Sequence, residues 1–527
     1  MTKKLPAEGS LRSFLPGALI LSLSGILSRL CGAIFRIPLT NLVGPQAMGY
    51  FGSAYSVYNF LLALATSGIP TGISAMVARA AANRRHGDIP AVMGFAAAFF
   101  LSFSGIVTLL GVSFARPLAV LMNSAEAFYC VLAIVPAVFF ITVVALIRGF
   151  FQGYRNMVPT ALSNLIEAAL KLVAGYGFAF VLHLRGYSPS VVVGGAMMGV
   201  TLGTVISALF MVLRYLLRGK QYRIPAVAGE KTPKRLLIRD FFAVTFPVIL
   251  SAVTVNLMGA LDACFVVNRM KPFFGVDGAN FRWGCYGSMA MTLFNLPSFL
   301  LVSVGTSLIP SVSAARARKD VSSLRATVDS ALSLSAVLAF GCGFGLSAVS
   351  EGAITLFYGG QSAEAITLSS RLLSVLSPAL VCVGLTNVTA SVLQGVGKAQ
   401  MSVVSVAVGS VIKTIVSYVT VAIPRCNVFG APLSTNLAYP VMLALNLAFL
   451  KKYAGVTPSF SEILFKPLVS ALGCWGAVVS ARPVLSAFFG VPWSVFAEIA
   501  LGGVVYIALL FLLKQRVFCV KRKTFKK

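Results

Sequence analysis

The sequence predicts an all-α polytopic membrane protein, with about fourteen transmembrane helices in two six-helix pseudo-symmetric lobes plus two C-terminal helices. Of the 527 residues, 58% are hydrophobic and only 11% are charged, and the mean hydropathy is +0.90. The apolar residues form runs of about 20, the length that crosses the hydrocarbon core of a bilayer as a helix. The runs lack the alternation of strands, and a helix satisfies its own backbone hydrogen bonds in lipid.

The N-terminal half contains six predicted helices. The first run begins near Phe14, after a short basic segment, and is too long for the core of a signal peptide, so we expect it to be retained. Prolines such as Pro38, Pro70 and Pro136 lie inside these runs, where they kink a helix but are tolerated in membranes. The six predicted spans are 13–41, 50–78, 91–113, 127–151, 158–183 and 191–217.

The C-terminal half contains six further predicted helices, followed by two that lie outside the repeat described below. A basic stretch from Leu217 to Asp240, which contains Pro225, Gly229 and Pro233, is the expected linker between the halves. The predicted spans are 241–268, 284–312, 327–349, 369–393, 401–423, 430–451, 463–481 and 494–514.

The loop charges predict the orientation of these helices. When successive loops are assigned to alternate sides, 31 of the 43 Lys and Arg residues fall on the side of the two termini and 8 on the other side. Cytoplasmic loops of membrane proteins carry an excess of Lys and Arg, so both termini are expected in the cytoplasm. The remaining four cations lie inside predicted helices: Arg29, Arg36, Lys171 and Lys413.

The two halves repeat each other. Pro136-Ala137 and Gln152-Gly153 match Pro378-Ala379 and Gln394-Gly395 at an offset of 242, which also relates Lys171 to Lys413. Each repeat holds an even number of helices, so both insert in the same direction around an axis along the membrane normal. We therefore expect an N-lobe (1–225), a C-lobe (226–452) and a C-terminal part (453–527) with the last two helices and a basic cytoplasmic tail. Two six-helix halves around a cavity are typical of alternating-access transporters.

Arg29 and Arg36 are the first candidate site residues. They lie seven residues apart, about two turns, so both are on nearly one face of the first helix. An arginine deep in hydrocarbon costs ~2.5 to more than 10 kcal/mol and persists where it faces water, a partner or a ligand. The planar guanidinium suits a diphosphate, which it binds with paired hydrogen bonds. The alternative for Arg36 is that it snorkels to the far interface.

Four further charges lie within helices. Glu167 and Lys171 are four residues apart and can pair on one helix face, which makes them either a structural pair or site residues. Lys413 repeats Lys171, but Gly409 replaces the glutamate, so Lys413 needs another partner or an anion. Asp262 can pair with a lysine or bind a proton or Na⁺, and we expect it, with Glu167, to act in coupling or gating.

The composition also excludes several functions. The net charge of +29 resides mainly in short loops and tails, where it orients the protein and meets anionic lipids, so nucleic-acid binding is not expected. The nine cysteines lie mostly in apolar runs without a C-x-x-C pair, and the two histidines are far apart, which gives no metal-site spacing. We expect no cofactor, and coupling to the membrane potential, H⁺ or Na⁺.

Four segments together resemble the multidrug/oligosaccharidyl-lipid/polysaccharide (MOP) exporter superfamily, and within it the stage V sporulation protein B-like and lipid II flippase branch of bacteria. They are SGILSRLCGAIFRIPLTNLVGPQAMGYF, TSGIPTGISAMVA, LMGALDACFV and NLPSFLLVSVGTSLIPSVS, and the similarity covers most of the first twelve predicted helices. The resemblance implies a cationic cavity for an undecaprenyl-diphosphate-linked saccharide, with Arg29 and Arg36 at cavity positions and Asp262 at an acidic position. Thr292 stands where the flippases carry an arginine.

The expected function is export of an undecaprenyl-diphosphate-linked cell-wall precursor, lipid II, across the bacterial cytoplasmic membrane. Arg29, Arg36, Lys171 and Lys413 are the expected substrate-binding residues, and cell-wall synthesis enzymes are candidate partners. A cation-coupled multidrug antiporter of the same fold and a non-transporting cell-wall scaffold remain alternatives. An enzyme is not expected, because the 14 acidic residues are scattered and no large outer loop is present to carry catalysis.

Overall fold

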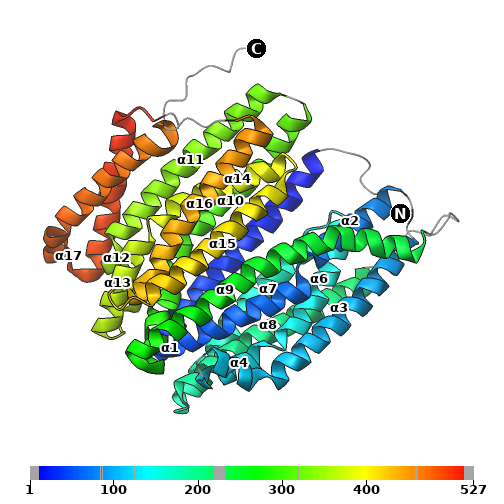
Figure 1. The fold of residues 1–527 in the computed structure, drawn as a ribbon, viewed down its shortest axis with the longest axis horizontal. Coiled ribbons are helices and arrows are strands. Elements are labelled where there is room, and N and C mark those ends of the chain that lie inside the picture. Colours follow the sequence, from blue (N-terminus) through cyan, green and yellow to red (C-terminus); the bar gives the residue numbers. More distant parts are fainter. Residues whose placement is uncertain are drawn as a thin grey trace. The chain divides into compact units, whose positions relative to one another are not determined.

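The computed structural model describes residues 11–83, 85, 87–122, 125–218, 232–318, 320–456 and 461–515. Across these residues the chain is helical and contains no strand (Figure 1). Contacts divide the helices into two compact units. The first unit comprises Met1–Phe35, Ala54–Leu121 and Ala125–Leu257, and the second comprises Arg36–Ser53, Met122–Ser124 and Met258–Lys527.

The all-α polytopic membrane fold is confirmed, whereas the helix count of fourteen stays a prediction. The described residues contain eleven helices long and apolar enough to span a membrane, or twelve if one bent pair forms a single span. Two of these helical runs have 60 and 83 residues. At 1.5 Å per residue even the shorter one is about 90 Å long, roughly three times the hydrocarbon thickness, so neither is one straight span.

Glycines interrupt the longest helices. Helix α1 (Leu11–Thr66) is broken at Gly44 and α9 (Lys234–Gly284) at Gly275, both with positive φ. Helix α17 (Lys466–Leu512) is broken in the same way at Gly490. Glycine adopts positive φ without the steric cost that other residues incur. The loops predicted at 42–49, 269–283 and 482–493 are therefore mostly helical, with the change of direction concentrated at one glycine in each.

Besides its parts of α1 and α9, the described part of the first unit contains the 3₁₀ helix η1 (Ala125–Ala127) and seven α-helices. Helix α2 packs on α6, and α7 packs closely on α8, where a Cβ added at Gly199 would lie 2.1 Å from the Cα of Gly175. The elements are α2 (Ile69–Ala82), α3 (Asp88–Ser113), α4 (Ala115–Leu121), α5 (Phe128–Ile134), α6 (Ala137–Gly153), α7 (Val158–Leu184) and α8 (Pro189–Arg218).

The second unit holds the remaining helices. Helix α14 packs against α10, α11 and α16, and α17 packs along α11 and α12 (Figure 1). The elements are the π-helix η3 (Cys285–Ala290), α10 (Met291–Ala317), α11 (Val321–Ala348), α12 (Ser350–Tyr358), α13 (Ala363–Leu376), α14 (Ala379–Gly395), α15 (Ala399–Val421), η4 (Asn427–Phe429), α16 (Gly430–Ala454), η5 (Ser461–Phe465) and α17.

The sequence repeat is visible in the helices. Helices α6 and α14 both have 17 residues, start directly after Pro136 and Pro378, and end at Gly153 and Gly395. A Cβ on either terminal glycine would lie 2.6–2.7 Å from a valine side chain of α2 or α10. The helices that come after α6 and α14 also pack in the same way in both units: α7 packs on α8, and α15 packs on α16. The repeated residues thus make equivalent contacts.

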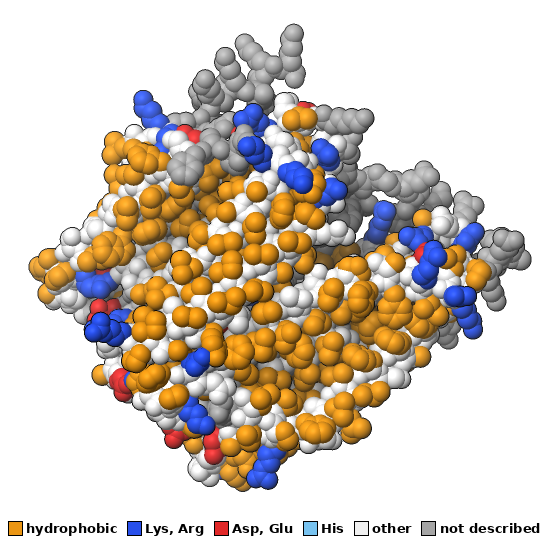
Figure 2. All heavy atoms as spheres, in the orientation of Figure 1, with side chains coloured by type: hydrophobic (Ala, Val, Ile, Leu, Met, Phe, Trp, Pro, Cys, Tyr) orange, Lys and Arg blue, Asp and Glu red, His pale blue; other side chains and the backbone are white. Residues whose placement is uncertain are grey.

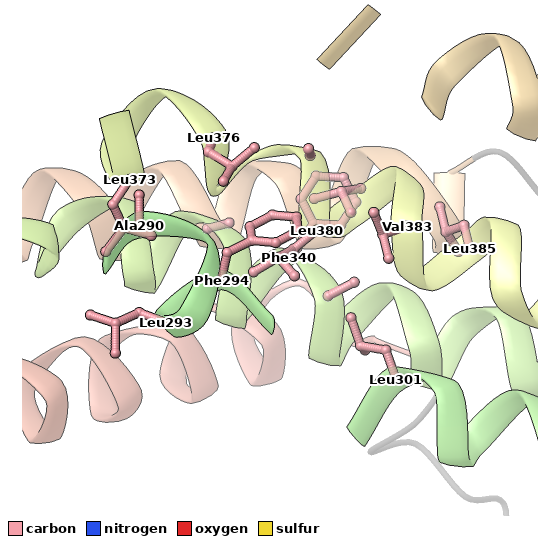
Figure 3. Close-up of a cluster of buried hydrophobic side chains, with 14 of the residues drawn as sticks. Ala290, Leu293, Phe294, Leu301, Phe340, Leu373, Leu376, Leu380, Val383 and Leu385 are labelled. Carbon is pink, nitrogen blue, oxygen red and sulfur yellow. The ribbon is translucent and has the colours of Figure 1, made fainter. Parts of the chain in front are cut away.

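An apolar cluster forms the core of the second unit. Ala290, Phe294, Phe340 and Leu380 point toward one another from η3, α10, α11 and α14 (Figure 3). Figure 2 shows many hydrophobic side chains on the visible helix surfaces, with Lys and Arg side chains concentrated near helix ends. Exposed apolar side chains such as Val173 at 70% and Leu512 at 75% suit helices whose outer faces contact lipid rather than water.

Candidate functional site

Lys171 lies on α7 in the first unit, beside aromatic residues of α1. Its Nζ atom donates a hydrogen bond of 3.4 Å to the Tyr55 hydroxyl. The same Nζ lies 4.9 Å from the ring centroid of Tyr55 and 5.6 Å from that of Phe35. Aromatic faces attract a cation without neutralising its formal charge. These contacts leave the half-buried ammonium able to attract an anion.

Glu167 pairs with Arg148 of α6, not with Lys171 as the four-residue spacing predicted. An Arg148 Nη2 atom lies 3.4 Å from Oε2 of Glu167, and Arg148 Nε donates to the Ser163 hydroxyl at 2.9 Å. The loop-charge count includes Arg148 on the side of the termini, although the predicted span 127–151 contains it, and the structure places it inside α6 with a side chain 16% exposed. The signal available in the sequence was its position in an apolar run, five residues before the helix end.

Lys413 finds its partner in Asp262. The lysine lies on α15 and the aspartate on α9, and Nζ donates to Oδ2 at 2.8 Å. The Asp262 side chain is 6% exposed and that of Lys413 is 27% exposed. Gly409 cannot be replaced by an acid without a shift, because even a Cβ there would lie 2.2 Å from Met442 Cγ. The second repeat thus supplies its carboxylate from another helix, which was one of the alternatives left open by the sequence.

Arg269 lies near this pair on the same helix, α9. Its guanidinium carbon is 3.9 Å from the ring centroid of Tyr418 on α15, and the Tyr418 ring contacts Phe265 edge-on at 5.4 Å. The predicted span 241–268 leaves Arg269 in a loop, but α9 continues through it to the break at Gly275. Tyr418 is the repeat equivalent of Tyr176, so the sequence singles out this tyrosine. Its contact with Arg269 could not be predicted from the sequence.

Arg29 and Arg36 lie on the same helix, α1, but belong to different units. Arg29 is in the first unit and its side chain is exposed. Arg36 is in the second unit, half-buried, with its guanidinium carbon 5.7 Å from the ring centroid of Phe51. Its carbonyl oxygen accepts the hydroxyl of Thr40 at 2.8 Å. Both cations thus lie on a helix that contributes to both units, and their position inside the membrane stays a prediction.

Four of the described cations inside helices make contacts of two kinds. Arg148 and Lys413 are each held by a carboxylate, whereas Lys171 and Arg269 are held by aromatic rings. Within the described residues no group of three or more His, Cys, Asp or Glu side chains is arranged to hold a metal ion. The helices accordingly carry an excess of positive charge, which suits an anionic ligand better than a cationic one.

The model of the polysaccharide biosynthesis protein family matches residues 14–316, more than half of the chain. The chain belongs to this family. The MatE family model matches residues 247–419 as well, and both families lie in the MOP superfamily that the sequence motifs resemble.

Relatives from Bacillus subtilis (strain 168) cover nearly the whole chain. The uncharacterised membrane protein YabM is 26% identical over 506 residues, 93% of this chain and 91% of the relative. Stage V sporulation protein B is 24% identical over 461 residues, 86% of each chain. Lipid II flippase MurJ is 23% identical over 498 residues, 90% of this chain and 87% of the relative. The predicted superfamily and branch are thus confirmed.

Solved structures show the same fold. Lipid II flippase MurJ in an inward closed conformation aligns with a TM-score of 0.72 and 14% identity, covering 95% of this chain and all of that structure. An inward-facing multidrug resistance MATE transporter aligns with a TM-score of 0.63 and 18% identity, covering 83% and 99%. The protein is therefore a multi-pass membrane transporter or flippase of the MOP superfamily. Its relatives are transporters rather than enzymes, as the sequence predicted.

Proposed function

We propose that this protein exports an undecaprenyl-diphosphate-linked cell-wall precursor, most specifically lipid II, across the bacterial cytoplasmic membrane by alternating access. The observation that supports this most directly is the excess of cationic side chains on apolar helices, with Lys171 held by aromatic rings instead of by a carboxylate. A diphosphate is the anionic part of such a lipid, and its charge would have to be neutralised during passage through the membrane. Similarity to lipid II flippase MurJ supports the same substrate class.

In this proposal Arg29, Arg36, Lys171 and Lys413 bind the diphosphate. The two arginines offer forked donors, and the two lysines occupy equivalent places in the repeats. Lys413 is bound to Asp262 at 2.8 Å, so an incoming anion competes with that carboxylate for the ammonium. Asp262 then acts as the gating charge, while Glu167 keeps Arg148 neutralised and only indirectly affects Lys171.

The membrane potential supplies part of the driving force in this proposal. With both termini in the cytoplasm, as the loop charges predict, export moves an anion away from the negative side. That movement is favourable by about 2.3 kcal/mol per charge per 100 mV. In proteoliposomes, collapsing an inside-negative potential with valinomycin and K⁺ is expected to slow outward flipping, and an unchanged rate contradicts this coupling.

The experiment that tests the function is rescue of a bacterium depleted of its lipid II flippase. Wild type, Arg29→Ala and Arg185→Ala are expressed at matched membrane levels, and lipid II reaching the outer face is measured. Arg185 is a matched control, because it lies in the exposed turn after α7. Wild type and Arg185→Ala are expected to restore export, and Arg29→Ala is not. Failure of well-inserted wild type to rescue contradicts lipid II as the substrate.

A cation-coupled multidrug antiporter is the second candidate, favoured by the match of residues 247–419 to the MatE model. Such a mechanism needs an acid that exchanges H⁺ or Na⁺ for a cationic drug. Asp262 is a buried acid on α9, and it is bound to Lys413. The antiporter predicts that expression confers drug resistance on a sensitive host and that Asp262→Asn abolishes it, whereas the flippase predicts no resistance.

A further inference from the structure

A cavity of about 370 Å³ lies within the second unit, and none of the six residues assigned to transport lines it. It is lined by the C-terminal end of α11, the first turn of α12, one face of α13 and part of α17. Its volume is within the range of small-ligand sites, which combine a hollow with a few convergent polar groups. All four elements belong to one unit, so the cavity is defined by contacts inside that unit.

Arg482 of α17 lines this cavity and is held in place by its contacts. It donates to the carbonyl oxygen of Ala348 at the end of α11 and to Oε2 of Glu351 in α12 at 3.3 Å. Its Nε atom lies 3.7 Å from Oε2 of Glu498, whose side chain is 3% exposed. Contacts with two carboxylates thus hold the Arg482 guanidinium in one position. Glu351 remains 69% exposed and able to accept further hydrogen bonds.

Arg371 is the arginine of the lining for which no ion pair is found among the described residues. It lies on α13, lines the cavity and is exposed. Among the residues that the structure describes, no carboxylate lies within 4 Å of Arg371, in contrast to Arg482. The guanidinium of such an arginine can donate paired N–H hydrogen bonds to a phosphate or carboxylate of a ligand. The cavity therefore has a place for one anionic group.

The other lining residues can bind a ligand that has hydroxyl groups and a flat apolar face. Ser347, Ser350, Ser370 and Thr367 place hydroxyls around the cavity. Each hydroxyl has one donor and two acceptor sites, so the bond of Ser370 to the Ile366 carbonyl leaves its acceptor sites available. Trp475, 39% exposed, adds an aromatic ring to the wall. Sugars combine hydroxyls with a face of C–H groups that packs on such rings.

We propose that this cavity binds a hydroxyl-rich head group carrying one phosphate or carboxylate. Arg371 binds the anion, the hydroxyls and Glu351 bind the ligand's hydroxyls, and Trp475 packs against its carbon skeleton. The cavity is a site separate from the transport cations, so the inference does not depend on lipid II being the substrate. The same chemistry occurs in a sugar phosphate and in the glycerophosphate head group of a phospholipid.

Binding to the purified full chain, kept in a detergent without a sugar head group, tests the proposal. Isothermal titration calorimetry is performed with inorganic phosphate, N-acetylglucosamine 1-phosphate and dihexanoyl phosphatidylglycerol. The variants are Arg371→Ala, Trp475→Ala and Trp475→Phe, with Arg425→Ala as the matched control. Arg425 is an exposed arginine in the turn after α15, outside the cavity. Arg482 is left intact, because its removal would leave Glu498 buried without a partner.

The proposal predicts that the sugar phosphate or the phosphatidylglycerol binds at least about tenfold more tightly than inorganic phosphate. Arg371→Ala weakens that binding by about tenfold, the usual effect of losing one charge-assisted contact, and Trp475→Ala weakens it because the packing on the ring is lost. Trp475→Phe and Arg425→Ala leave it nearly unchanged. Which organic probe binds identifies the source of the head group. Equal affinity for inorganic phosphate, the absence of binding to wild type, or full binding by Arg371→Ala overturns the proposal.

Discussion

Removing Lys413 while leaving Asp262 in place is expected to destabilise the second unit strongly. The two charges lie 2.8 Å apart, and the aspartate is 6% exposed. At an effective dielectric constant of 20, a pair at this distance attracts by about 6 kcal/mol before desolvation is subtracted. Breaking a buried pair by removing one partner costs about 3–5 kcal/mol, because the other charge stays buried alone. We therefore expect Lys413→Met to lower the free energy of unfolding by about 3 kcal/mol or more.

A double-mutant cycle separates this coupling from general damage. Asp262→Asn is expected to be destabilising on its own, and the double variant Asp262→Asn with Lys413→Met is expected to recover most of the loss. The exposed pair Arg79–Asp240, with side chains 58% and 33% exposed, is the internal control. Its cycle is expected to give under about 1 kcal/mol, since exposed ion pairs contribute little.

Unfolding is followed by circular dichroism as the fraction of sodium dodecyl sulfate in mixed micelles is raised. Two results would refute the reasoning: a loss below about 1 kcal/mol for Lys413→Met, or losses for the two single variants that simply add in the double variant. Either result would mean that the ammonium and the carboxylate are independently solvated, and Asp262 would then lose its assigned role as the charge released by an incoming anion.

Three further predictions use the same protein. Gly284→Ala places a Cβ 1.7 Å from the carbonyl oxygen of Pro45, so it should lower the unfolding free energy by at least about 1–3 kcal/mol, whereas Gly287→Ala, with nothing within 4 Å, should not. The Asp320 carboxylate accepts hydrogen bonds from the Ser323 amide at 2.9 Å and the Ser322 hydroxyl at 2.8 Å, which lowers its pKa. Its contribution is therefore present above pH ~4 and lost as pH falls through the lowered pKa, so unfolding midpoints of wild type and Asp320→Ala should differ at pH ~7 and converge in acid. Lys171→Met should slow flipping in proteoliposomes while Lys171→Arg retains it, since arginine also binds to aromatic faces; equal rates for all three proteins would exclude a role for this charge.

Local patterns in the sequence predicted much of the fold. The offset of 242 between Pro136 and Pro378 correctly predicted two matching helices. Each helix starts directly after its proline and ends at a glycine that packs closely on a neighbouring helix, and both features depend on single residues. The bends near Gly44 and Gly490 were expected as loops, since glycine and polar residues interrupt the apolar runs there. Their helical surroundings were missed, because a single residue with positive φ is enough to change direction.

Charge partners were much harder to predict. The spacing of four residues predicted that Glu167 pairs with Lys171. In the fold Glu167 pairs instead with Arg148, which is 19 residues earlier in the chain. Asp262 and Lys413 are separated by 151 residues, and only the packing of α9 on α15 brings them together. The cavity beside Arg371 was missed for the same reason, since Arg371 and Arg482 are simply two of the eight cations on the side away from the termini, 111 residues apart. Contacts between distant helices leave no signal in local spacing.

The measurement that tests the central claim most directly is lipid flipping by the purified protein. Proteoliposomes containing lipid II are prepared with wild type, with Arg29→Ala, with Arg185→Ala and without protein, and lipid II in the opposite leaflet is quantified over time. The account predicts flipping with wild type and Arg185→Ala, and a rate close to that of empty liposomes with Arg29→Ala. Wild type no faster than empty liposomes, or Arg29→Ala as fast as wild type, would contradict it.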